Sequence, residues 1–254
     1  MVVNGNRPTG IIAVNNQSKQ YAVVFRGSKD LPDYATDFLL TLVPMQFGKN
    51  DSTANFTLML QNKDLPKMAG RLARRQLEKP KNVHQGFLDA WNRGREKYLT
   101  ILNDAISKNP SFEIVFTGHS LGGALATLAA VDFVSTSTDP MATAKKTSLI
   151  TYGQPRVGDK GFAEYVDSLP WKESTRVVRK SDPIPRSPPT MFGFAHFKTE
   201  KFLVDNNNFV ASCKLSGVAG ETTDCSGAEV EEIRPMHTQV YFSTNMSSLF
   251  TQEC

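Results

Sequence analysis

The sequence predicts a single α/β domain with a mostly parallel central sheet flanked by helices. Segments rich in β-branched and aromatic residues alternate with helical patterns of about ten residues or more, which is typical of βαβ units. The chain of 254 residues is long enough to bury one large core. Its 40% hydrophobic and 21% charged residues are close to globular averages and exclude disordered and fibrous classes.

The first predicted elements are a hairpin and two helices. Gly10 to Arg26 contains two strands joined by the turn-forming residues 15–18. Apolar residues then recur at helical spacing from Leu31 to Leu42, which predicts a short helix with one apolar face. A longer helix is predicted from His84 to Ser107, with Asn109-Pro110 as its stop signal.

Residues 45–83 are predicted to be an insertion. Its central stretch, Asn50 to Asn82, contains two glycosylation sequons and then a basic segment. The spacing of Leu65, Met68 and Leu72 allows a basic amphipathic helix that contacts an interface. A solvated helix face is the favoured interpretation, because such charge runs usually face water.

The second half continues the alternation. Strands are predicted at Phe112 to Thr117, Thr147 to Tyr152 and Arg176 to Arg179. The first strand is followed by an apolar helix pattern that starts at Ala124, and a helix is predicted at Gly161 to Leu169 between the other two.

Ser120 lies between the first of these strands and its helix, in the sequence Gly118-His119-Ser120-Leu121-Gly122. A serine bracketed by glycines at a strand-to-helix turn is the nucleophile elbow of α/β-hydrolases, because the glycines let strand and helix approach closely. The alternative is a glycine-rich turn without chemistry, but the strand and helix on either side favour the elbow. We therefore expect the Ser120 hydroxyl to project from the top of the sheet.

A serine nucleophile needs a base and an acid that orients the base. In α/β-hydrolases the order along the chain is serine, acid, histidine, which leaves His196 and His237 of the four histidines. His237 is preferred because a late loop reaches the serine from outside the sheet more easily, whereas His196 lies in an aromatic stretch typical of a core or pocket wall. Asp182 is the predicted acid, since it follows a strand and precedes the rigid Pro183-Ile184-Pro185 segment.

Two backbone amides are predicted to stabilise the oxyanion. One belongs to Leu121, the residue after the nucleophile. The other belongs to Ser28, in a turn after an early strand where Gly27 permits a tight bend. This chemistry requires no metal and no organic cofactor.

Charge, hydropathy and cysteine content limit the partners and the compartment. The net charge is only +4, and the Lys and Arg residues are scattered along the chain except in the basic segment. This distribution does not indicate nucleic-acid binding. No apolar run reaches the roughly 18 residues of a membrane span, and the first ten residues contain no signal-peptide core. Cys213 and Cys225 flank a polar loop and can close it by a disulfide. Together with four sequons, at Asn16, Asn50, Asn55 and Asn245, they favour secretion over a reduced intracellular location.

A family resemblance rests on motifs that span the chain from about Gly10 to the end. They are FRGS at 25–28, VHQGF at 83–87, TGHSLGGALA at 117–126, YGQPRVGD at 152–159, DPIP at 182–185 and MHTQVYF at 236–242. Together they resemble the class 3 lipases, the filamentous-fungal triacylglycerol lipases of the α/β-hydrolase fold. The resemblance implies Ser120 as nucleophile, Asp182 as acid, His237 as base, and Ser28 and Leu121 as oxyanion donors.

The resemblance also implies features outside the catalytic residues. The helix from Leu31 to Leu42 occupies the place of the family's mobile lid, although a fixed core helix has the same apolar pattern. Family members have an amino-terminal helix ahead of the first strand, which this chain lacks, and a terminal cysteine similar to Cys254 bonds to that part. We therefore expect a longer precursor with a signal peptide and a partner for Cys254.

The expected function is that of a secreted serine ester hydrolase acting on acylglycerols at an oil–water or membrane interface. A phospholipase A1 or a feruloyl-type esterase is the alternative within the same chemistry. A lipid-binding protein that kept the fold and lost turnover is the alternative from another class, and the complete set of expected catalytic residues counts against it. The sequence predicts no particular oligomeric state.

Overall fold

The computed structural model describes residues 2–3, 10–27, 40–47, 81–204, 213–214, 220–227, 237, 240–241 and 244–245. Within them a seven-stranded sheet has the order β1-β2-β3-β6-β7-β9-β11. Its strands are β1 Val2–Val3, β2 Gly10–Asn15, β3 Gln20–Phe25, β6 Glu113–His119, β7 Thr147–Tyr152, β9 Glu173–Arg179 and β11 Glu200–Leu203.

The sheet is antiparallel at one end and parallel over the rest. β1, β2 and β3 pair antiparallel, and β3, β6, β7, β9 and β11 are all paired parallel. The predicted hairpin and the mostly parallel sheet are thus confirmed. The predicted strand at Arg176 starts earlier, at Glu173, and β11 was not predicted from its short, mixed sequence.

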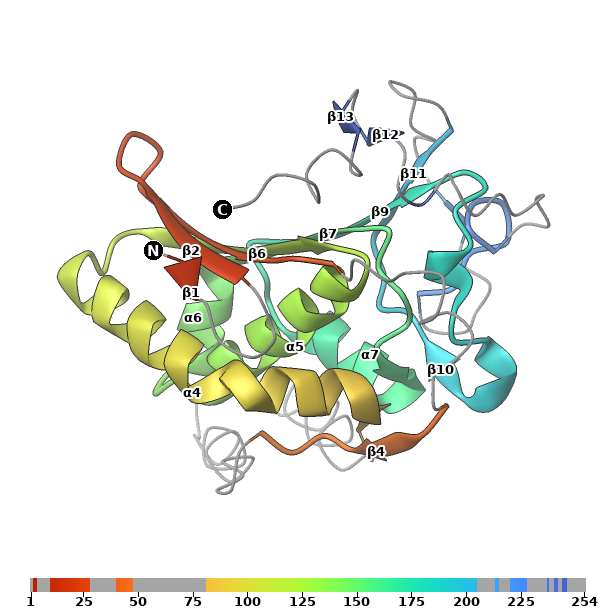
Figure 1. The fold of residues 1–254 in the computed structure, drawn as a ribbon, viewed down its shortest axis with the longest axis horizontal. Helices are drawn as coiled ribbons and strands as arrows, with labels where there is room; N and C mark the ends of the chain where they lie inside the picture. The colour runs from red at the N-terminus through yellow and green to blue at the C-terminus, as the bar shows by residue number, and fades with distance from the viewer. Residues whose placement is uncertain are drawn as a thin grey trace, which may run out of the picture.

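The described helices cover one face of this sheet (Figure 1). They are α4 Gln85–Lys108, α5 Leu121–Ser135, α6 Pro140–Lys145 and α7 Lys160–Ser168. The two long predicted helices are confirmed, as is α7, whereas α6 was not predicted. α5 is buried almost all round, and its many small side chains let it pack closely between the sheet and α4.

Aromatic rings join α4 to the hairpin strand β3. The Phe25 ring lies 5.8 Å from Trp91, edge to face, and 5.0 Å from Tyr98. All three side chains are almost completely buried. Such rings bury large apolar areas and favour edge-to-face or tilted contacts, so they hold α4 against β3.

A second, four-stranded sheet has the order β10-β8-β5-β4. Its strands are β4 Leu42–Pro44, β5 Asn82–His84, β8 Gly158–Asp159 and β10 Phe194–Ala195. Leu42 pairs with His84 in this sheet, so the helix predicted from Leu31 does not extend to Leu42. Residues 31–39 of that helix lie outside the described residues.

The ends of the predicted insertion are part of this second sheet and of the core. The Met45 amide donates to the Lys81 carbonyl at 2.8 Å, and Met45, Phe47 and Val83 are all buried. Residues 48–80 lie outside the described residues, so the insertion itself stays a prediction. Its predicted bounds of 45–83 include residues that pack into the domain.

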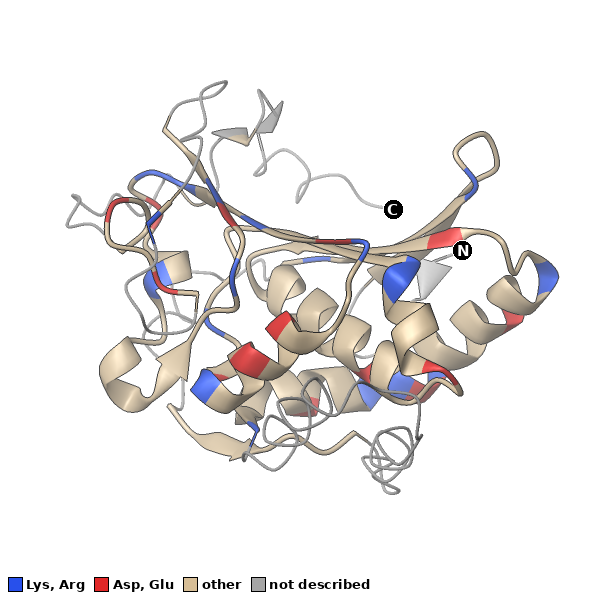
Figure 2. Ribbon diagram, turned by 180° about the vertical axis from the view of Figure 1, so that it is seen from behind, with Lys and Arg blue, Asp and Glu red and all other residues tan. Residues whose placement is uncertain are grey.

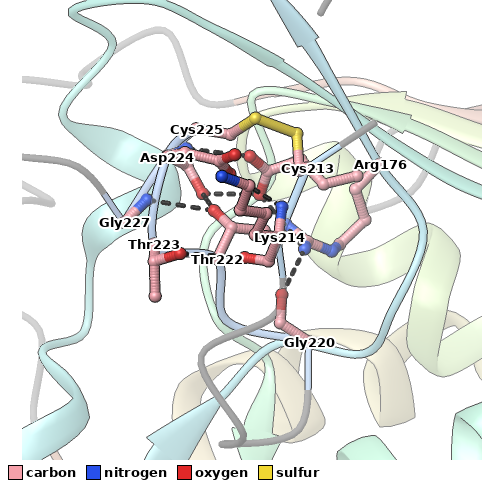
Figure 3. Close-up of a disulfide and its surroundings, with 11 residues drawn as sticks. Arg176, Cys213, Lys214, Gly220, Thr222, Thr223, Asp224, Cys225 and Gly227 are labelled. Carbon is pink, nitrogen blue, oxygen red and sulfur yellow. Dashed lines mark hydrogen bonds and ion pairs between the residues drawn. A yellow bond between two sulfur atoms is a disulfide. The ribbon is translucent and has the colours of Figure 1, made fainter. Parts of the chain in front are cut away.

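A disulfide closes the segment from Cys213 to Cys225, as predicted (Figure 3). Glu200 lies close enough to both sulfurs to resemble a metal-ligand cluster. The sulfurs are bonded to one another, and neither is a thiolate that could ligate a metal. The cluster is therefore a structural crosslink beside the edge strand β11.

Charged residues of both signs are interspersed along the described helices and strands (Figure 2). No helix in the described ranges is long and apolar enough to cross a bilayer. Cys254 and the sequons at Asn50 and Asn55 lie outside the described residues, and the partner expected for Cys254 stays a prediction. Asn16 lies in the exposed turn between β2 and β3.

A buried ion pair joins α4 to α5. Asp132 accepts hydrogen bonds from Arg95 Nε at 2.6 Å, Arg95 Nη2 at 2.9 Å and Trp91 Nε1 at 2.8 Å. Its carboxylate is completely buried, whereas Arg95 reaches solvent at one edge. Removing one partner of a buried pair leaves the other charge uncompensated.

We predict that Asp132→Ala lowers the free energy of unfolding by about 3 kcal/mol, measured by urea denaturation. Asp104→Ala is the matched control, because its ion pair with Lys108 is exposed on α4, where water screens the attraction and leaves it little effect on stability. Equal losses for the two variants would contradict the importance assigned to the buried pair.

Candidate functional site

Ser120 lies between β6 and α5 in a backbone conformation that favours glycine. Its φ is 59° and its ψ is −130°. Such a conformation costs on the order of 1–3 kcal/mol in a residue with a side chain and persists only where the surroundings enforce it. The Ser120 amide donates to the Tyr152 carbonyl at 2.9 Å, and the Ser120 carbonyl accepts from Gly123 at 2.9 Å. The predicted strand-turn-helix elbow is therefore present.

The glycines at either side of the elbow allow the backbone to approach itself. A Cβ on Gly118 would lie 2.3 Å from the Gly122 carbonyl, and one on Gly122 would lie 2.2 Å from the Phe25 carbonyl. Real Cβ atoms do not come so close to backbone atoms, so a side chain at either position would push strand and helix apart. The pattern that identified the elbow is thus required by its geometry.

Asp182 lies at the same edge of the sheet. The parallel strands β6, β7 and β9 run in register, with His119 opposite Tyr152 and Tyr152 opposite Val177. Parallel strands have their carboxyl ends at one edge, where ligand sites of open α/β sheets lie. Ser120 follows β6 at this edge, and Asp182 follows β9 after a bend at Ser181.

The carboxylate of Asp182 is buried and held by several donors. The Ile184 amide donates to Oδ1 at 2.9 Å, and the Tyr241 hydroxyl donates to Oδ2 at 2.8 Å. His237 Nδ1 lies 2.9 Å from each carboxylate oxygen. The two groups that the sequence assigned as acid and base are therefore in direct contact, although 55 residues separate them.

This contact sets the state of the imidazole. A carboxylate only accepts hydrogen bonds, so Nδ1 of His237 carries a proton, and in the neutral ring this tautomer leaves the lone pair on Nε2. Among the described residues, no hydrogen-bond partner reaches the buried Nε2 atom. His237 is thus prepared to accept a proton through Nε2.

The backbone at Tyr152 and Gly153 links the serine side of the site to the histidine side. Ser120 bonds to the Tyr152 carbonyl, and a Cβ on Gly153 would lie 3.1 Å from His237 Cε1 and 3.0 Å from Asp182 Oδ2. Gly153 has a φ of +53°. A side chain here would be strained by the backbone and crowded by both groups. Ser120 and His237 are therefore both close to one short backbone segment.

His119 packs on the predicted base. Its ring lies 4.5 Å from the His237 ring, stacked at 28°, and 5.5 Å from the Tyr241 ring. Burial and the neighbouring His237 lower the pKa of His119 to about 3. His119 therefore stays neutral at physiological pH and supports the base as a flat, uncharged surface.

His196, the alternative base, has a different role in the structure. It is buried, and its Nε2 atom donates to the Pro185 carbonyl at 2.7 Å, since a carbonyl can only accept. Burial and the nearby Arg176 hold its pKa well below the usual range. The structure brings His237, and not His196, into contact with Asp182.

Of the remaining predicted site residues, some lie within the described part of the chain and others do not. Leu121 begins α5, so its amide belongs to the first turn, where N–H groups have no acceptor within the helix. Ser28 and most of the predicted lid helix lie outside the described residues. Asp159 and Asp167, two other aspartates that follow Ser120 in the chain, accept hydrogen bonds from the Phe162 and Lys198 amides respectively.

The sequence reasoning missed the role of Tyr241. This tyrosine lies four residues after His237, in β12 Val240–Tyr241, which pairs with β13 Thr244–Asn245. Its hydroxyl is completely buried against Asp182, and this burial raises its pKa well above the usual value. The spacing from the histidine was the available signal, but a single chain does not distinguish it from ordinary core packing.

Comparisons with known proteins agree with this geometry. Residues 22–192 match the family described as Lipase (class 3). A lipase of Rhizomucor miehei is 31% identical over 237 residues, which are 92% of this chain and 55% of that protein. A secreted mono- and diacylglycerol lipase of Fusarium solani is 32% identical, over 87% of this chain and 57% of that protein. The chain spans about half the length of these curated relatives.

Solved structures show the same fold. A triacylglycerol lipase whose catalytic centre is described as a serine protease triad superimposes with a TM-score of 0.70 at 28% identity. The match covers 94% of this chain and 77% of that one. The α/β-hydrolase fold expected from the sequence is confirmed, and the chain belongs to the class 3 lipase family.

Proposed function

We propose that this chain is a serine carboxylic-ester hydrolase that acts on acylglycerols. The observation that carries the proposal is the buried contact between His237 Nδ1 and the Asp182 carboxylate, beside the strained elbow of Ser120. The contact orients the imidazole of His237, and the elbow lies at the same edge of the sheet. These are the parts that acyl transfer by a serine requires.

In the proposed reaction, Ser120 Oγ attacks the ester carbonyl while His237 Nε2 takes its proton. Asp182 stabilises the imidazolium that forms, and His237 then donates the proton to the leaving alcohol. Water attacks the acyl-enzyme with His237 again as base, which releases the fatty acid and regenerates the serine. Every proton in the cycle passes through His237 Nε2.

The negative charge that develops on the carbonyl oxygen requires hydrogen-bond donors that are already in place. We assign the Leu121 amide, at the amino terminus of α5, as one donor, because the helix dipole also favours an anion there. Ser28, which follows β3 in the sequence, is the proposed second donor. Each such donor lowers the barrier by about 3 kcal/mol.

Family membership supports lipid esters as substrates at an oil–water or membrane interface. The relatives of known name include a lipase and a mono- and diacylglycerol lipase, and the latter is named as secreted. The Cys213–Cys225 disulfide agrees with an oxidising compartment, so we propose secretion of this chain as well. Residues 31–39 are the proposed site of a lid.

The proposed nucleophile is tested by Ser120→Ala. We predict that a fluorophosphonate probe labels the native protein and fails to label the variant. Hydrolysis of emulsified triacylglycerol should fall by about 10⁵-fold or more, since the nucleophile has no substitute. Intact, folded protein that the probe does not label would support a lipid-binding role instead.

Phospholipid and aryl feruloyl esters are assayed in parallel with triacylglycerol. Faster hydrolysis of one of these esters would favour a phospholipase or a feruloyl-type esterase over a triacylglycerol lipase.

Exchange of each candidate histidine tests the proposed base. His237→Ala should reduce kcat by about 10⁵-fold because no other group takes the serine proton. His196→Gln keeps an amide donor for the Pro185 carbonyl and should lose far less. Rates are compared on a soluble 4-nitrophenyl ester after circular dichroism has verified folding. Greater damage from the His196 variant would show that the wrong histidine was assigned.

Tyr241→Phe removes the hydroxyl that bonds to Asp182 and keeps the ring that packs on His119. We predict a decrease in kcat of about tenfold with little change in KM, because a hydrogen bond to a buried carboxylate is worth about 1.5–3 kcal/mol. Steady-state kinetics measure both constants. An unchanged kcat would mean that Ile184 and His237 alone hold the carboxylate.

A further inference from the structure

The loop that follows Asp182 is held through four consecutive carbonyl groups. His196 Nε2 donates to Pro185 at 2.7 Å, and the Arg156 amide donates to Ser187 at 2.8 Å. Arg156 Nη1 donates to both neighbouring carbonyls, Arg186 and, at 3.0 Å, Pro188. One arginine thus contacts three successive peptide groups of the loop with its backbone and its guanidinium.

Glu221 holds this arginine from the opposite side. Its carboxylate accepts from Arg156 Nε at 2.8 Å and from Nη2 at 2.7 Å, a bidentate pair in which both side chains are 8% exposed. The His196 amide also donates to Glu221, at 3.0 Å. Burial alone would raise the pKa of Glu221, but the bonds from Arg156 and the nearby His196 lower it to about 2. The pair is therefore ionised throughout the range in which the protein would act.

Glu221 belongs to the segment closed by the disulfide. Cys213 and Cys225 lie at its ends, and Arg176 from β9 donates to the Gly220 carbonyl at 3.2 Å (Figure 3). The Gly220 amide in turn donates to the His196 carbonyl at 2.6 Å. Glu221 is thus held by the crosslinked segment and by the strand that leads to Asp182.

We propose that Arg156 and Glu221 are positioning residues for Asp182. The inference rests on the proposed function, because it assigns a purpose to the loop that carries the proposed acid. The loop turns tightly in the 3₁₀ helix Ile184–Arg186, so a shift of its anchored carbonyls moves the Ile184 amide that holds Asp182. Arginine fits this task because its planar fork serves a carboxylate and two carbonyls together, which a lysine ammonium does not.

A merely structural ion pair would behave differently. It would lower thermal stability without a specific effect on turnover. A positioning pair acts through Asp182, so its effect on kcat disappears once Asp182 no longer functions. Displacing a reacting group by about 1 Å can cost on the order of 100-fold in rate, so the effect is measurable.

The experiment is a double-mutant cycle of Arg156→Lys and Asp182→Asn in the full chain, with 4-nitrophenyl butyrate as substrate. We expect Arg156→Lys to lower kcat by about 10- to 100-fold and to change KM by less than about twofold. In the Asp182→Asn background the same substitution should change kcat by less than about threefold. Arg95→Lys is the matched control, because Arg95 forms an equally bidentate pair with Asp132 away from the loop.

The outcomes separate the inference from the proposed function. Arg95→Lys should lower the melting temperature but change kcat by less than about twofold in either background. In one outcome, Asp182→Asn lowers kcat strongly while Arg156→Lys lowers kcat by the same factor in both backgrounds. That result would overturn the positioning role and leave the assigned acid in place. A nearly normal kcat for Asp182→Asn would overturn both the assigned acid and the positioning role. Glu221→Gln, which keeps the side-chain shape, replaces Arg156→Lys in the cycle if that variant does not fold.

Discussion

The site depends on one buried interaction, the contact of the Asp182 carboxylate with Nδ1 of His237. An ionised carboxylate away from water is costly unless donors surround it. Here the Ile184 amide, the Tyr241 hydroxyl and the imidazole supply those donors. The same contact places a proton on Nδ1 of His237. One hydrogen-bonded arrangement therefore stabilises the buried carboxylate and orients the proposed base.

The fold brings the parts together through the register of its parallel strands. β6, β7 and β9 end at one edge and deliver Ser120, Gly153 and Asp182 in sequence order. β12, which supplies Tyr241, lies on the side of the sheet opposite to the helices (Figure 1). The acid and the base thus arrive from separate parts of the chain, and small residues such as Gly153 leave the space in which they meet.

The sequence predicted most of the central sheet and the two long helices, and it singled out Asp182 and His237, which the structure brings into contact. These features depend on local patterns, such as alternating apolar residues before Ser120 or a strand that ends before Asp182. The sequence did not predict β11, whose pairing with β9 is set by tertiary contacts rather than by its own composition. It also missed strand β4 at Leu42 and the contacts of Tyr241, Arg156 and Glu221. Each of these contacts joins residues that are distant in the chain, which periodicity does not encode.

The central claim is that Ser120, His237 and Asp182 act as one unit, and a crystal structure of the protein inactivated by an alkyl phosphonate ester tests it most directly. The account predicts phosphorus bonded to Ser120 Oγ, with His237 Nε2 within about 3 Å of an oxygen of the adduct. His237 Nδ1 should still donate a hydrogen bond to the Asp182 carboxylate. The Leu121 amide should face the phosphoryl oxygen. A phosphonate attached to another residue, or a His237 ring turned away from the adduct while Asp182 binds elsewhere, would contradict the account.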